Sequence, residues 1–203
     1  MRQRNPDYIS IVVIASGVSM RSGRNRLLEL IGEKTMIEHV VSECLTSKAK
    51  QVIVVVGHDA EKVRVALKDQ ACDIVLDEDF AKGQNYSIKK GLAEVQEESD
   101  GVMVVPGDIA LVDRTTINSL IREYSTCYAP IVTTGRRGSS FHPILIDRNL
   151  LAELKNMNNE SDGLTSLASK YRAKSHLVQT SEASLLRLSK QAGRIRARLG
   201  LSK

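Results

Sequence analysis

The chain has 203 residues, of which 42% are hydrophobic and 26% charged, with a formal net charge of +5, two Phe, five Tyr and no Trp. So few aromatic side chains argue against a single-strand nucleic-acid binder, which stacks bases on aromatic rings, and the charge is too modest for a dense basic stripe. The length suits a single domain over residues 1–203 that buries a substantial core.

The cysteines and the lengths of the apolar runs bear on the cellular compartment of the protein. Cys44, Cys72 and Cys127 are odd in number, far apart and without a C-x-x-C pair. This spacing argues against a disulfide framework or a zinc site and suits a reducing cytosol. No apolar run approaches the roughly 18 residues of a membrane span, and residues 1–10 lack the apolar core of a signal peptide. We therefore expect a cytoplasmic protein without a membrane partner.

Short β-branched runs alternate with segments of helical period along the chain. Continuous apolar runs predict strands covered on both faces, and we expect them at residues 9–15, 51–57, 72–76, 101–107, 129–134 and 142–146. Apolar positions spaced three or four apart predict helices at residues 35–45, 59–69, 85–95 and 113–124. Thr35 and Asp59 are the expected N-caps of the first two helices. Two or three more helices are expected after the last strand.

This alternation predicts an α/β fold with three layers, in which helices cover both faces of a mostly parallel, twisted sheet. Ligands of such sheets collect where loops leave the carboxyl ends of the strands. The first of these loops, after residues 9–15, contains Gly17, Arg21 and Gly23. Gly17 lets the backbone approach a ligand, and Arg21 can fork onto phosphate oxygens. A surface loop with solvated arginines is the alternative.

The stretch IASGVSMRSGRNRLL, residues 14–28, resembles the opening signature L-A-A-G-x-S-x-R-M-G-x-x-K-L of the molybdenum cofactor nucleotidyltransferases. The resemblance implies a Rossmann-like nucleotidyltransferase fold, in which this loop wraps a nucleoside triphosphate. Arg21 and Arg26, the latter replacing the lysine, would be catalytic residues that hold phosphates, and the backbone at Ala15, Ser16 and Gly17 would face the base. The implied nucleotide-binding residues are Ala15, Ser16, Gly17, Ser19, Arg21, Gly23 and Arg26.

Two later stretches continue the resemblance in chain order. Gly83 and Ser87 match a glycine and a serine that lie near the base in the family, although a loop followed by a helix cap is the simpler explanation. Gly107-Asp108 matches G-D-x-P, whose aspartate binds the catalytic Mg²⁺, or Mn²⁺ in its place. A carboxylate at a strand end can hold such a cation against a triphosphate, although Gly-Asp is also a common turn.

The remaining matches concern the acceptor and a second metal ligand. His142 and Pro143 are similar to the H-P pair of the cytidylyl branch and would bind the acceptor, although a structural, hydrogen-bonding histidine is the alternative. Asp162 is similar to a residue that touches the acceptor, although a simple helix cap at Ser161 is the alternative. The closing D-I-D-T-P-E-D of the family is absent: Val178 and Thr180 stand at the positions of its first two acids.

The resemblance implies a nucleotidyltransferase that transfers CMP from CTP, favoured over GTP, to the phosphate of a molybdopterin-type cofactor, with release of pyrophosphate. The missing acids leave open a non-catalytic nucleotide- or cofactor-binding accessory protein on the same fold. Another phosphorylated small molecule is the alternative acceptor. The basic C-terminal run, residues 187–203, is explained by a solvated helix, so we expect no nucleic-acid partner.

Overall fold

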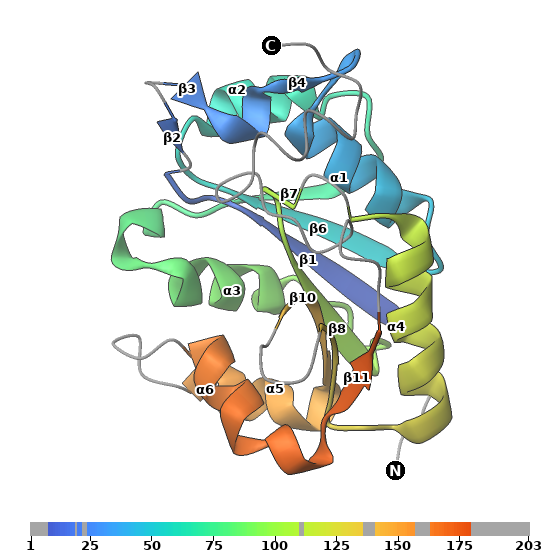
Figure 1. The fold of residues 1–203 in the computed structure, drawn as a ribbon. Coiled ribbons are helices and arrows are strands. Elements are labelled where there is room, and N and C mark those ends of the chain that lie inside the picture. The colour runs from blue at the N-terminus through green and yellow to red at the C-terminus, as the bar shows by residue number, and fades with distance from the viewer. Residues whose placement is uncertain are drawn as a thin grey trace.

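A twisted sheet lies between two layers of helices (Figure 1). The computed structural model describes residues 8–18, 20–21, 24–109, 112–135, 141–156 and 163–179, with the backbone alone at residues 20, 21, 24 and 141. Within these residues the main sheet has seven strands in the order β11-β9-β10-β8-β1-β6-β7. They are β1 Ile9–Ala15, β6 Gln51–Val56, β7 Asp73–Leu76, β8 Gly101–Pro106, β9 Ile131–Thr134, β10 Phe141–Asp147 and β11 His176–Val178.

The sheet is parallel except at β10, which pairs antiparallel with both β8 and β9. Strand β1 lies at the centre, parallel to β6 on one side and to β8 on the other. Two short hairpins follow β1, formed by β2 Met20–Arg21 with β3 Arg24–Asn25 and by β4 Leu30–Ile31 with β5 Lys34–Thr35. The predicted three-layer, mostly parallel architecture is confirmed.

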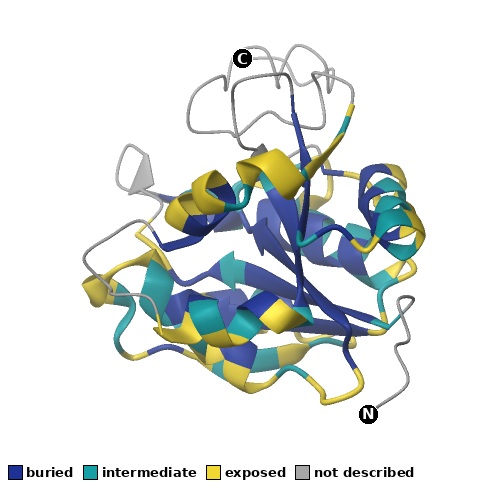
Figure 2. Cartoon of the chain, turned by 90° about the horizontal axis from the view of Figure 1, so that it is seen from below, coloured by how far each residue is buried: buried dark blue, intermediate teal, exposed yellow. Residues whose placement is uncertain are grey.

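Each face of the sheet has its own hydrophobic core. One face carries α1 Met36–Leu45, α2 Ala60–Ala66 and α4 Arg114–Cys127, and the other carries α3 Gln84–Ala93, α5 Leu151–Asn156 and α6 Gly163–Lys170. Along β1, Ile11 and Val13 join the first core and Val12 joins the second, because successive side chains of a strand point to opposite faces. Figure 2 shows the result: the inner strands are buried, whereas the edge strands β7 and β11 are partly exposed and the helices expose their outer faces.

Local sequence explains how α1 and α4 start, whereas α2 departs from the expectation. Thr35 accepts from the Glu38 backbone while the Glu38 side chain accepts from Thr35, which is a capping box, and Asp113 caps α4 in the ordinary way. Asp59 occupies the N-cap position of α2, as predicted. The prediction that its side chain caps the helix is wrong, because its φ is 54° and its side chain makes no capping hydrogen bond. Its carboxylate instead accepts from Asn25 and Lys62.

The remaining elements of the described residues are short 3₁₀ helices at Arg26–Leu28, Phe80–Lys82, Arg148–Leu150 and Arg172–Lys174. After β9, the expected further strand is β10, and α5 and α6 are the expected helices. Strand β11 was not anticipated, because three residues are too few to show a period. Within the described part of the chain, every helix is too short or too polar to cross a membrane.

Candidate functional site

A cavity of about 420 Å³ opens at the carboxyl ends of β1 and β8. This volume lies within the range of small-molecule sites, and the position is the expected one for an open α/β sheet. Seven of the residues predicted from the sequence line it together, although they come from four separate segments: Ala15, Ser16, Gly17, Arg26, Gly83, Ser87 and Asp108.

The end of β1 is held close to its neighbour β6. The His58 backbone N–H donates to the Ser16 carbonyl at 2.9 Å. A Cβ on Gly57 would lie 2.8 Å from that carbonyl oxygen and 2.7 Å from Cβ of Phe80, which itself lines the cavity. Gly57 lies outside the motifs that carry the family resemblance. Because only glycine fits between these two segments, Gly57 sets the position of the cavity wall.

Two buried hydroxyls and a buried carboxylate form a chain of hydrogen bonds behind the cavity, here called the relay: Ser16, Ser87 and Asp77. The Ser16 hydroxyl donates to Ser87 at 2.5 Å, and the Ser87 hydroxyl donates to Asp77 Oδ2 at 2.6 Å. The second oxygen, Asp77 Oδ1, accepts from the Asp79 backbone N–H at 3.0 Å. All three relay residues are at most 2% exposed.

The carboxylate fixes the direction of the relay, because it only accepts hydrogen bonds. The Ser87 proton is committed to Asp77, and the Ser16 proton is committed to Ser87. Both serines line the cavity, so the hydroxyls can offer it lone pairs but no protons. Ser87 therefore does not act as a helix cap; the N-cap of α3 is Gly83, without a side-chain bond. Asp77 is the site residue that the sequence analysis missed.

The loop that carries Arg26 is anchored by its neighbour. Asn25 accepts from the Leu27 N–H at 3.1 Å and donates through Nδ2 to Asp59 Oδ2 at 3.2 Å. The pKa of the Asp59 carboxyl is lowered, first by its hydrogen bond with Lys62 and then by that with Asn25, so the anchor stays ionised near neutral pH. Asn25 thereby ties the half-buried Arg26 at the cavity to the start of α2.

Asp108 lies two residues after the end of β8 and is the one acidic residue among the described residues that line the cavity. Mg²⁺ is commonly held by one or two carboxylates, with phosphates and waters completing an octahedron of oxygens. A half-buried carboxylate at the edge of a cavity that also contains Arg26 fits such an ion bound together with a triphosphate. Asp77 cannot serve as readily, because its oxygens are engaged inside the wall.

Other predicted residues lie elsewhere. His142 and Pro143 are in β10 and do not belong to the described cavity lining; the His142 carbonyl accepts from the Thr134 hydroxyl at 3.2 Å. Arg21 lies in β2, where only the backbone is described. Their roles stay predictions. Ser19, Gly23 and Asp162 lie outside the described residues, as does Thr180, whereas Val178 lies in β11.

Three known proteins show what this chain resembles in sequence and in structure. It is 32% identical over 117 residues to the bifunctional protein GlmU of Staphylococcus carnosus, covering 58% of this chain and 25% of GlmU. The chain thus spans about a quarter of the length of the curated relatives it matches. A nucleotidyl transferase of Methanothermobacter superposes with a TM-score of 0.81 at 20% identity, over 96% of this chain and 97% of that one.

The third is Rv0371c of Mycobacterium tuberculosis in complex with manganese, with a TM-score of 0.76 at 22% identity over 95% and 97% of the two chains. At these identities the solved structures establish the fold, which is that of a nucleotidyltransferase. The sequence also matches the family described as the MobA-like NTP transferase domain over residues 11–176. This chain therefore belongs to the MobA-like NTP transferase family, and its domain is of the nucleotidyltransferase enzyme type.

Proposed function

We propose that the protein transfers CMP from CTP to the phosphate of a molybdopterin-type cofactor and releases pyrophosphate. The observation that carries the proposal is that one cavity at the carboxyl ends of β1 and β8 brings together Ser16, Gly17, Arg26, Ser87 and Asp108. The backbone and serines suit a base, the arginine suits phosphates, and the carboxylate suits a divalent cation.

The relay supports a base that carries an amino group. Because Ser16 and Ser87 have committed their protons inward, they can accept a hydrogen bond from the cavity but not donate one. The exocyclic amino group of cytosine is a donor, whereas the corresponding oxygen of uracil is an acceptor. The relay thus favours CTP over UTP. The preference for CTP over GTP rests on the resemblance at His142 and Pro143.

The reaction needs no nucleophilic side chain. An oxygen of the acceptor phosphate attacks the α-phosphorus, the bond from that phosphorus to pyrophosphate breaks, and pyrophosphate leaves with the electron pair. Arg26 would bind the phosphates and stabilise the charge that develops on them, and the cavity walls would align the two substrates. Asp108 would hold Mg²⁺ or Mn²⁺, the latter being the metal with which the mycobacterial relative was solved, and the bound ion would neutralise charge on the triphosphate.

A non-catalytic nucleotide-binding accessory protein is the second candidate. Val178, at the end of β11, replaces the first acid of the family's closing motif and offers no metal ligand. One carboxylate can suffice when the triphosphate supplies the other oxygens, and for this reason we favour the enzyme.

Pyrophosphate release separates these candidates. The full chain is incubated with CTP, GTP, UTP or ATP and Mg²⁺, together with molybdopterin, a polyol phosphate or a sugar phosphate as acceptor. We expect release that needs CTP and molybdopterin and is lost in Asp108→Asn. Pyrophosphate release with a polyol phosphate or a sugar phosphate but not with molybdopterin would overturn the acceptor assignment. If calorimetry shows that CTP binds but no pair of nucleotide and acceptor releases pyrophosphate, the accessory-protein proposal would replace the enzyme proposal.

A further inference from the structure

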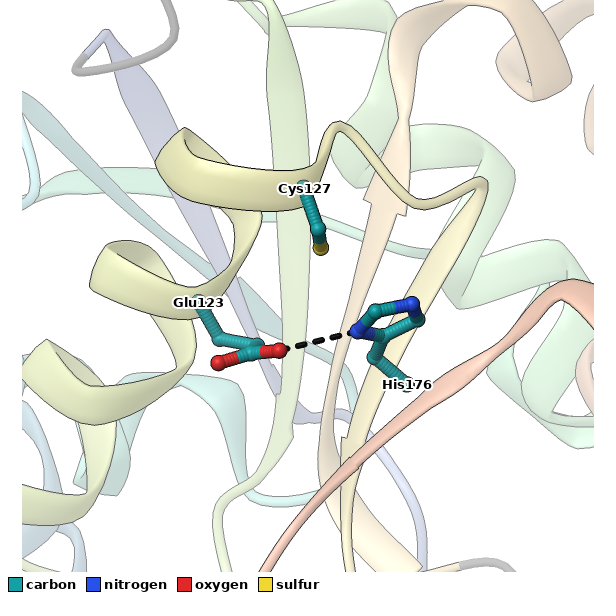
Figure 3. Close-up of side chains that lie close together, drawn as sticks. All are labelled: Glu123, Cys127 and His176. Atoms are coloured by element: carbon teal, nitrogen blue, oxygen red, sulfur yellow. Dashed lines mark hydrogen bonds and ion pairs between the residues drawn. The ribbon is translucent and has the colours of Figure 1, made fainter.

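Three potential metal ligands meet far from the cavity: Glu123, Cys127 and His176, here called the Glu-Cys-His cluster (Figure 3). One ligand atom from each side chain lies within 4.8 Å of the others. Glu123 Oε1 and His176 Nδ1 are 2.8 Å apart. None of the three lines the cavity described above. The cluster is therefore separate from the proposed nucleotide site.

Both local geometry and tertiary packing bring these groups together. Glu123 and Cys127 are four residues apart at the end of α4 and hence lie on one face of the helix. His176 is the first residue of β11, which pairs parallel with β9, and α4 packs against both strands. In Figure 3 the three side chains project from α4 and β11 toward a common point.

We propose that the Glu-Cys-His cluster is a binding site for Zn²⁺. Thiolate sulfur, imidazole nitrogen and carboxylate oxygen are the three ligand types that zinc takes in proteins, at about 2.3, 2.0 and 2.1 Å. Tetrahedral coordination at these lengths separates the ligand atoms by roughly 3.3–3.6 Å. The Glu123–His176 distance of 2.8 Å is shorter than this range and all three ligand atoms lie within 4.8 Å of one another, so side-chain movements of an ångström or so would suffice. Cys127 is a free thiol, and water can take the fourth position.

The softness of the donor set selects the metal class. A thiolate with an imidazole disfavours Mg²⁺ and Ca²⁺, which prefer oxygen ligands, and favours zinc over them. Bound zinc would link α4 to β11, a strand of three residues at the edge of the sheet. In the metal-free alternative, a Glu123–His176 ion pair links α4 to β11 without a metal ion. Cys127 is then a small apolar residue packed against the core.

Cobalt titration distinguishes the two arrangements, because Co²⁺ enters zinc sites and a bound thiolate gives it a near-ultraviolet charge-transfer band. The untagged full chain is reduced, freed of metal and titrated with Co²⁺. We expect the band to saturate at one equivalent and to vanish on addition of Zn²⁺. Cys127→Ser should abolish it. His176→Gln should weaken binding by about tenfold or more, since loss of even an outer-shell partner costs about 10–100-fold.

Matched variants identify the sulfur and the location. Cys72→Ser, which alters a half-buried cysteine outside the cluster, and Asp108→Asn should keep the full band. Zn²⁺ should raise the melting temperature of the unaltered chain but not of Cys127→Ser, whose fold is checked by circular dichroism. Absence of the band, or a band that survives Cys127→Ser, would overturn the proposal. Loss of the band in Cys72→Ser or Asp108→Asn would do so as well.

Discussion

Replacement of Asp77 by asparagine should reverse the relay without changing its shape. The Asp79 backbone N–H donates to Asp77 Oδ1, so in the variant the amide oxygen must occupy that place and the amide NH₂ must face Ser87. Ser87 then accepts from the amide and donates to Ser16 instead of accepting from it. The Ser16 proton is released toward the cavity, where it can now meet an acceptor.

The magnitude follows from the burial of the relay. Ser16 and Ser87 are 2% and 1% exposed, so an acceptor on the base that faces their lone pairs finds no water to replace the missing donor. Such a buried mismatch costs about 1–3 kcal/mol, which corresponds to roughly 5- to 150-fold in affinity. We expect the native chain to bind CTP more tightly than UTP by a factor of this order. Asp77→Asn should reduce the preference by about tenfold, mainly by improving the binding of UTP.

The assay is calorimetric titration of CTP and UTP into each protein at one salt concentration. Asp79→Asn is the matched control, since it removes the same charge two residues away from a partly exposed side chain that pairs with Lys82 at 2.8 Å. This control should keep the native ratio. Thermal unfolding of both variants verifies that they are folded. A ratio for Asp77→Asn that stays within about twofold of the native value would refute the relay as a determinant of base choice.

Four further outcomes are expected. Asp108→Asn should reduce metal-dependent pyrophosphate release by roughly a hundredfold; unchanged release would contradict its metal role. Arg26→Lys should lower turnover although the charge is kept, because lysine lacks the planar fork; equal kinetics would exclude a bidentate contact. Gly57→Ala should lower stability by about 1–3 kcal/mol in denaturant titration and weaken CTP binding, since its Cβ would clash with the cavity wall; a native midpoint would disprove the clash. Burial raises the pKa of the Cys44 thiol far above its usual value, so a thiol reagent near pH 8 should label Cys44 last of the three cysteines; early labelling would contradict this.

The sequence by itself determined the elements whose causes are local. The capping box of α1 lies within four consecutive residues, and continuous apolar runs predicted the buried strands of the main sheet. Short motifs that resemble those of the nucleotidyltransferase family, rather than these local signals, implied the seven site residues that line the cavity. Asp59 shows the limit: its type and position predicted a cap, but a partner 34 residues away, Asn25, competes for its carboxylate.

Only the tertiary structure decided which distant residues meet. Ser16 and Ser87 are 71 residues apart, and nothing in the run that contains Asp77 distinguishes this buried carboxylate from its more exposed neighbours Glu78 and Asp79. Glu123 and His176 are 53 residues apart, so a search for C-x-x-C spacing could not find the Glu-Cys-His cluster. Spacing along a chain reports contacts within one helix or strand, whereas sheet order and helix packing determine which of these elements face one another.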